Sequence, residues 1–152
     1  MFVPPYDVLL RALGVSRDDL ERKSEVTIPA SFLKFLLQRT VAQADFNEPG
    51  YLAANPDVAE ALRKKQITSA RDHYVSFGYF ECRRGANPSV DETWYTRSHP
   101  DVAASIRKKS VSSATEHYER TGIEEFRPPN EAVRDDCYAW KAALARKAKP
   151  KA

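Results

Sequence analysis

The sequence predicts an all-α protein, in which two tandem three-helix repeats with a period of 44 residues are flanked by N-terminal and C-terminal helices. The first observation is a duplication: residues 48–83 align without a gap with residues 92–127, a shift of 92 − 48 = 44 positions. Sixteen of the 36 aligned positions are identical, whereas chance at ordinary composition gives about two. The second observation is composition: the chain has only 5 glycines and is 30% charged, which favours helices over sheets.

Residues 1–45 are predicted to form helices that cap the repeats or mediate oligomerisation. A short amphipathic helix covers residues 6–14, where leucines recur at helical spacing. A polar turn then leads into a second short helix that begins at Ser16, a residue type that caps helices well.

A longer helix is predicted over residues 30–45, opened by Pro29. Its apolar side includes Phe32 and Phe35 and is unusually broad for a surface helix. We therefore expect this helix to be buried or to lie in a subunit interface.

The first repeat, residues 46–88, is predicted to hold three short helices and a return loop. The first helix covers residues 49–54, and Pro56 takes the first position of the second, where its missing N–H costs nothing. Ser69 begins the third helix as part of a capping box. Gly78 is expected to end that helix in a left-handed conformation.

The second repeat, residues 90–132, carries the same signals at Pro100, Ser113 and Gly122. One repeat alone has little apolar surface, so we expect the two repeats to pack on each other. The positions that are identical in both repeats, numbered in the first, are Glu48, Tyr51, Pro56, Asp57, Val58, Ala59, Arg63, Lys64, Lys65, Ser69, Ala70, His73, Tyr74, Gly78, Glu81 and Arg83.

The chain is predicted to end with one more helix and a tail. The pair Pro128 and Pro129 ends the second repeat, and Asn130 is expected to cap a helix over residues 131–147. Residues 148–152 are expected to form a disordered basic tail.

Composition and charge argue against several classes of protein. The net charge is +3, from 24 basic and 21 acidic residues, and this small excess does not indicate a nucleic-acid partner. The most apolar stretch, residues 28–37, is half the length of about 20 residues that a membrane-spanning helix needs. The N-terminus shows no signal peptide, so a cytoplasmic location is expected.

No group of residues forms a recognisable catalytic, cofactor or metal site, so we expect a non-enzymatic protein without a cofactor. His73 and His117 lie beside tyrosine on apolar helix faces in both repeats. We interpret them as structural, with a ring nitrogen bonded to a backbone carbonyl or to an acid. Metal-ligand spacing is absent, and Cys82 and Cys137 are interpreted as reduced thiols.

Two of the candidate recognition residues, Trp94 and His99, lie at positions where the repeats differ. Trp94 corresponds to Gly50, so the fold does not require a large ring there and the indole could stack on a sugar. Arg83 and Arg127 each follow a glutamate by two residues and could bind an anion or a sugar, although we favour an ion pair that fixes the return loop. The candidates are Trp94, Tyr95, His99, Phe32, Phe35, Arg83 and Arg127.

Residues 46–129 resemble a tandem helical repeat of bacteria. The first copy reads YLAANPDVAEA from Tyr51 and HYVSFGYFECR from His73, close to the family pattern YLxxNPDVAxA…HYxxxGxxEGR. The second copy departs at Thr96 and His99, and both copies lack the glycine between the last Glu and Arg. The family accompanies glycosyltransferase modules and surface or calcium-binding repeat proteins. This resemblance implies a recognition module near carbohydrate assembly or the cell envelope.

The sequence thus favours a scaffolding or recognition module that binds a protein partner, with self-association into a homo-oligomer as the first expectation. Two alternatives stay open. One is a small DNA-binding regulator, because residues 8–40 are similar to a helix-turn-helix, although residues 30–40 are too apolar to enter a major groove. The other is a carbohydrate-binding module that uses Trp94 and neighbouring tyrosines.

Overall fold

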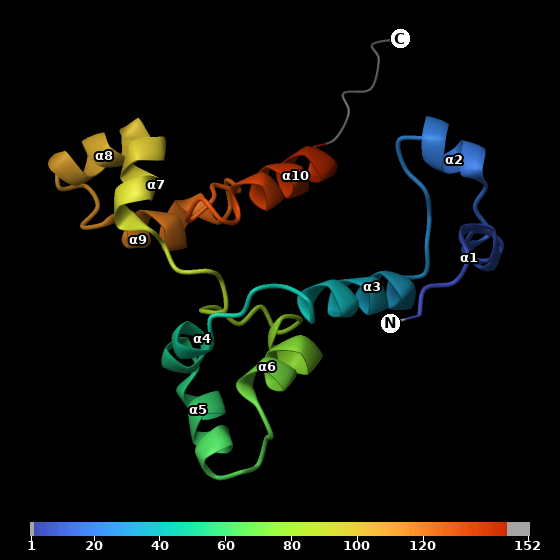
Figure 1. The fold of residues 1–152 in the computed structure, drawn as a ribbon, viewed down its shortest axis with the longest axis horizontal. Helices are drawn as coiled ribbons and strands as arrows, with labels where there is room; N and C mark the ends of the chain where they lie inside the picture. The colour runs from blue at the N-terminus through green and yellow to red at the C-terminus, as the bar shows by residue number, and fades with distance from the viewer. Residues whose placement is uncertain (1, 146–152) are drawn as a thin grey trace. The chain divides into compact units, whose positions relative to one another are not determined.

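The computed structural model describes residues 2–145 and confirms the all-α class (Figure 1). These residues form ten α-helices and two π-helical turns, and no β-strand occurs among them. The described chain divides into two units, one before and one after the bond between Gln43 and Ala44.

The N-terminal unit contains α1 (Tyr6–Leu13), α2 (Arg17–Arg22) and α3 (Ala30–Val41). As predicted, Ser16 caps α2: its hydroxyl accepts from the Asp19 N–H at 3.0 Å, and the Asp19 carboxylate accepts from the Ser16 N–H at 2.9 Å.

The helix predicted to reach residue 45 ends at Val41. The next residues are bound to the first repeat instead. The Ala44 carbonyl accepts from Arg71, and the Asn47 N–H donates to the Ala86 carbonyl. Because these backbone groups are hydrogen-bonded to the first repeat, they are not available for the bonds that would continue α3.

The first repeat consists of α4 (Glu48–Ala54), α5 (Pro56–Arg63), α6 (Ala70–His73) and the π-helical turn η1 (Tyr74–Gly78). Local sequence signals determine where each helix begins. Asn47 caps α4 through the Gly50 N–H, Pro56 takes the first position of α5, and Ser69 accepts from the Asp72 N–H at the start of α6.

The second repeat follows the same plan with α7 (Glu92–Ser98), α8 (Pro100–Arg107), α9 (Ala114–His117) and η2 (Tyr118–Gly122). Asp91 caps α7 through the Trp94 N–H, and Ser113 caps α9 through the Glu116 N–H. Each set of three helices forms its own small group in Figure 1.

Each repeat has its own hydrophobic core. In the first repeat, Tyr51, Val58, Ala70 and Ala86 are buried together. In the second, the core is formed by Trp94, Tyr95, Val102, Ala114 and Tyr118. A fully buried tyrosine supplies much of the apolar surface that a unit of this size otherwise lacks.

Gly78 and Gly122 do not end a helix in the left-handed conformation that the sequence predicts. Both lie within the π-helical turns, and neither has a positive φ. A side chain at Gly78 would collide with the Tyr51 hydroxyl, and one at Gly122 with the Tyr95 hydroxyl. Glycine is needed here because a buried tyrosine lies directly against the backbone.

The left-handed positions are occupied by larger side chains instead. Lys65 and Lys109 follow α5 and α8 with φ of 57° and 58°. Cys82 and Phe126 adopt φ of 57° and 55° at the corner that follows each π-helical turn. This conformation is one that glycine adopts more readily than larger side chains do.

The last helix, α10, runs from Arg134 to Leu144 and therefore begins three residues later than predicted. The Asn130 side chain does accept from the Val133 N–H, at 3.3 Å, but it also donates to the Ser89 carbonyl at 2.9 Å. This second bond ties Asn130 to the loop between the repeats. The helix also ends earlier than predicted, at Leu144 rather than at residue 147, and the backbone of Ala145 is extended. The predicted tail 148–152 lies outside the described residues.

Candidate functional site

Arg83 and Arg127 form the ion pairs that the sequence favoured over a ligand site. Arg83 lies 2.8 Å from the Asp57 carboxylate and 2.6 Å from that of Glu81. Arg127 makes the same two contacts in the second repeat, and its bond to Asp101 is also 2.8 Å. Each arginine thereby ties the corner of its repeat to the first turn of α5 or α8.

These ion pairs favour the charged form of the acids. The hydrogen bond from Arg83 lowers the pKa of Asp57 below its ordinary value of 3.8. Arg127 lowers the pKa of Asp101 in the same way. With two carboxylates on each guanidinium, little positive charge is left to attract an anionic ligand.

His73 and His117 are structural, but their partners differ from those predicted. The His73 Nδ1 lies 3.0 Å from the Tyr51 hydroxyl, and the His117 Nδ1 lies 3.1 Å from the Tyr95 hydroxyl. Neither a backbone carbonyl nor an acid takes this place. The bond gives the buried phenol a hydrogen-bond partner, and burial raises the pKa of Tyr95 to about 12.

Trp94 and Tyr95 are core residues, so they do not offer a surface to a sugar. Trp94 is 7% exposed and Tyr95 is fully buried. The comparison with Gly50 misled the sequence interpretation. In the first repeat, Gly50 packs directly against the Gly85 backbone, where no side chain would fit. In the second repeat, the indole itself is part of the core.

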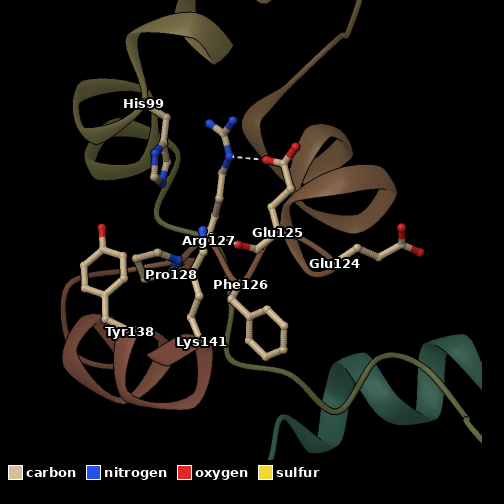
Figure 2. Close-up of a pocket in the computed structure, with 8 residues that line it drawn as sticks. All are labelled: His99, Glu124, Glu125, Phe126, Arg127, Pro128, Tyr138 and Lys141. Atoms are coloured by element: carbon tan, nitrogen blue, oxygen red, sulfur yellow. Dashed lines mark hydrogen bonds and ion pairs between the residues drawn. The ribbon is translucent and has the colours of Figure 1, made fainter. Parts of the chain in front are cut away.

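The structure brings His99 and Arg127 together at a pocket of about 460 Å³ in the second repeat. Figure 2 shows the His99 ring on one side, the Arg127 guanidinium between it and Glu125, and Tyr138 and Lys141 reaching in from α10. Lys141 donates to the Glu125 carbonyl at 3.1 Å. Sequence reasoning did not place Tyr138 and Lys141 here, because no local signal tells which face of α10 meets this corner.

In the second repeat, His99 occupies the position that Asn55 has in the first, and it lacks part of the hydrogen bonding of Asn55. The Asn55 amide donates to the Tyr51 carbonyl at 2.8 Å and to the Arg84 carbonyl at 2.9 Å. The Nε2 of His99 is buried and has no hydrogen-bond partner among the described residues. Burial and, after it, the charge of Arg127 lower the pKa of His99, which favours the neutral ring. The His99 ring lines the pocket, while its Nε2 is shielded from solvent.

The N-terminal unit exposes the candidate residues of α3. Phe35 is 50% exposed and Phe32 is half-buried. Leu33 and Leu36, one helical turn apart, are 48% and 42% exposed. Of the two expectations for this helix, burial is wrong, and the interface stays a prediction.

Among residues 2–145, no group of three or more histidine, cysteine, aspartate or glutamate side chains is close enough to hold a metal ion. Both cysteines are free; Cys82 is exposed, and burial raises the pKa of the Cys137 thiol. None of the helices in this part of the chain has both the length and the apolarity needed to cross a lipid bilayer.

The N-terminal unit differs from a helix-turn-helix. That motif joins its helices by a turn of three or four residues, whereas residues 23–29 separate α2 from α3. The basic side chains of α2 are paired with acids one turn away: Arg17 with Glu21, and Arg22 with Asp18. These arginines are therefore poorly suited to contact phosphates.

Comparisons with protein-family models, with curated proteins and with solved structures found no match for this chain.

Proposed function

We propose that this protein is a non-enzymatic helical module that associates with other proteins, in the first place with a second copy of itself, through its N-terminal unit. The observation that carries the proposal is the exposure of that unit. From residue 2 to residue 43, the only buried side chain is that of Val41. Tyr6 on α1 and Leu33 and Phe35 on α3 are between 48% and 55% exposed.

Such a unit lacks the means to stabilise itself. Its helices have 8, 6 and 12 residues, and isolated helices shorter than about 12–15 residues are marginal in water. Amphipathic helices of this length need an apolar partner surface. Contiguous exposed apolar side chains on a folded chain commonly mark such a surface.

The resemblance to the bacterial repeat supplies the setting that we propose, which is the cell envelope or polysaccharide assembly. The repeats then serve as a scaffold. Their identical residues cap helices, form the two cores, or make the ion pairs of Arg83 and Arg127 at the corners. The cytoplasmic location stays a prediction.

Sedimentation velocity across a range of protein concentrations tests the proposal. We expect the wild-type chain to associate and a variant with Leu33→Ser and Leu36→Ser to remain monomeric. Phe77→Ser is the matched control, because Phe77 is 59% exposed but lies in η1 of the first repeat. Its association should equal that of the wild type. A dissociation constant of about 1 mM corresponds to weak association. A wild-type chain that is still monomeric at about 100 µM, a tenth of that value, contradicts self-association.

A further inference from the structure

Two exposed apolar helix faces, on α3 and on α10, match each other in length, in the order of their side chains and in charge. We propose that α3 of one copy packs antiparallel against α10 of a second copy, and that the second copy returns the same contact. This inference rests on the proposed self-association and names the surfaces that meet.

One face of α10 is free of its own repeat. Tyr138 and Lys141 point to the pocket in the second repeat. Asp136, Trp140 and Leu144 are spaced four residues apart and so form a row along another side of the helix. Trp140 is 46% exposed and Leu144 is 59% exposed. A tryptophan with this exposure at the centre of a helix face is typical of an association surface.

The corresponding face of α3 is apolar and basic. Phe32 and Leu36 are four residues apart, Leu33 lies beside them, and Arg39 follows one turn after Leu36. The guanidinium of Arg39 lies over the Phe35 ring, 5.4 Å from its centroid. The charged residues of α3 are Lys34 and Arg39, and the helix has no acid.

Charge therefore distinguishes between possible partners. Two α3 helices brought together would oppose like charges, which is unfavourable in an interface. The first turn of α10 instead carries Asp135 and Asp136. Asp135 is engaged by Arg134 at 3.0 Å, whereas the exposed Asp136 makes no ion pair with another described residue. Asp136 is thus available to a basic side chain of the partner.

The register follows from these positions. In an antiparallel pair, Arg39 near the end of α3 lies opposite Asp136 near the start of α10. Leu36 then meets Trp140, and the first turn of α3 meets Leu144. At 1.5 Å per residue, the helices of 12 and 11 residues are about 18 Å and 16 Å long, so their faces cover each other. Antiparallel helix dipoles add a favourable term.

Exchange of the two charges tests this contact. We expect Arg39→Glu and Asp136→Arg to weaken the dimer about tenfold each, since each opposes like charges across the interface. The double variant should recover to within about threefold of the wild type, because it restores the pair in reverse. Sedimentation equilibrium gives the dissociation constants, and far-UV circular dichroism checks that each variant is folded.

Arg107→Glu and Glu119→Arg are the matched controls, because they make the same charge changes at exposed positions of the second repeat. They should leave the dissociation constant unchanged. Iodide quenching adds a second measurement: Trp94 is 7% exposed, so loss of quenching on association reports on Trp140. The α3–α10 contact is overturned if neither charge reversal changes the dissociation constant of the dimer, or if the double variant associates as weakly as the single variants. Either result leaves self-association itself in place. A strictly monomeric wild type overturns the proposed function itself.

Discussion

At Gly78 and Gly122, the missing side chain makes room for a tyrosine hydroxyl. Tyr51 is fully buried, and its hydroxyl is held by His73 at 3.0 Å. The phenol cannot move aside without breaking this bond, so the glycine is fixed by packing rather than by backbone conformation.

Gly78→Ala should therefore destabilise the first repeat by about 1–3 kcal/mol, the usual cost of overfilling a packed site. Urea unfolding measures the loss. Tyr51→Phe removes the hydroxyl that the new methyl group would strike, so Gly78→Ala should cost clearly less in that background. Equal costs in both backgrounds would mean that another contact excludes the side chain.

Cys82 holds a left-handed backbone conformation at the first corner, with φ of 57°. This conformation costs a non-glycine residue roughly 1–2 kcal/mol, and the exposed thiol offers little packing in return. Cys82→Gly should raise the free energy of unfolding by about 0.5–1 kcal/mol, after the greater chain entropy of glycine is allowed for. Cys82→Ala is the control: it removes the thiol but keeps the strain, so it should give no gain.

At the scale of the elements, each arginine corner connects a loop to the start of a helix. Arg127 holds Asp101 in the first turn of α8, and this hydrogen bond is the main cause that lowers the pKa of Asp101. A lowered folded-state pKa means that the stabilisation is complete above the ordinary value of 3.8 and is lost as pH falls through the folded value.

Asp101→Asn should thus lower the urea midpoint at neutral pH, and the difference from the wild type should shrink as the pH falls below about 4, near the ordinary pKa of an aspartate. Asp135→Asn serves as the control, because the Asp135 side chain is 86% exposed and its arginine partner is the adjacent residue. A difference between Asp101→Asn and the wild type that stays constant down to pH 2 would rule out this carboxylate as its source.

Element starts were predictable from the sequence because capping is local. Ser16, Asn47 and Ser69 accept from backbone N–H groups within three residues, and Pro56 fits a first helical turn by its own geometry. The end of α3 and the start of α10 were not predictable in this way. Both depend on bonds to distant segments, such as the one from Asn130 to Ser89.

The site was less predictable, because burial depends on tertiary contacts. The ion pairs of Arg83 and Arg127 followed from charge and spacing. The burial of Trp94 did not follow, since a tryptophan opposite a glycine in an alignment can equally be exposed. The bond between Tyr51 and His73 joins two residues that each looked like a simple core position.

At the scale of the whole molecule, the two repeats are stabilised by separate cores. Val58 is 2% exposed in the first core, and Val102 is fully buried in the second. Val58→Ala should cost about 2 kcal/mol and lower amide-exchange protection in α4–α6, while α7–α9 keep theirs. Val102→Ala should give the reverse pattern. Loss of protection in both repeats from either change would show that the cores unfold as one.

Separate cores also bear on how such a chain can change over generations. Substitutions at distant, independent sites add without interaction, so an altered residue in one repeat need not be matched in the other. The replacement of Asn55 by His99 is one such divergence, and it left the neighbouring Tyr95–His117 bond in place. Duplication with separate cores therefore lets one copy preserve the scaffold while its twin accumulates variation, from which a new binding surface can be selected.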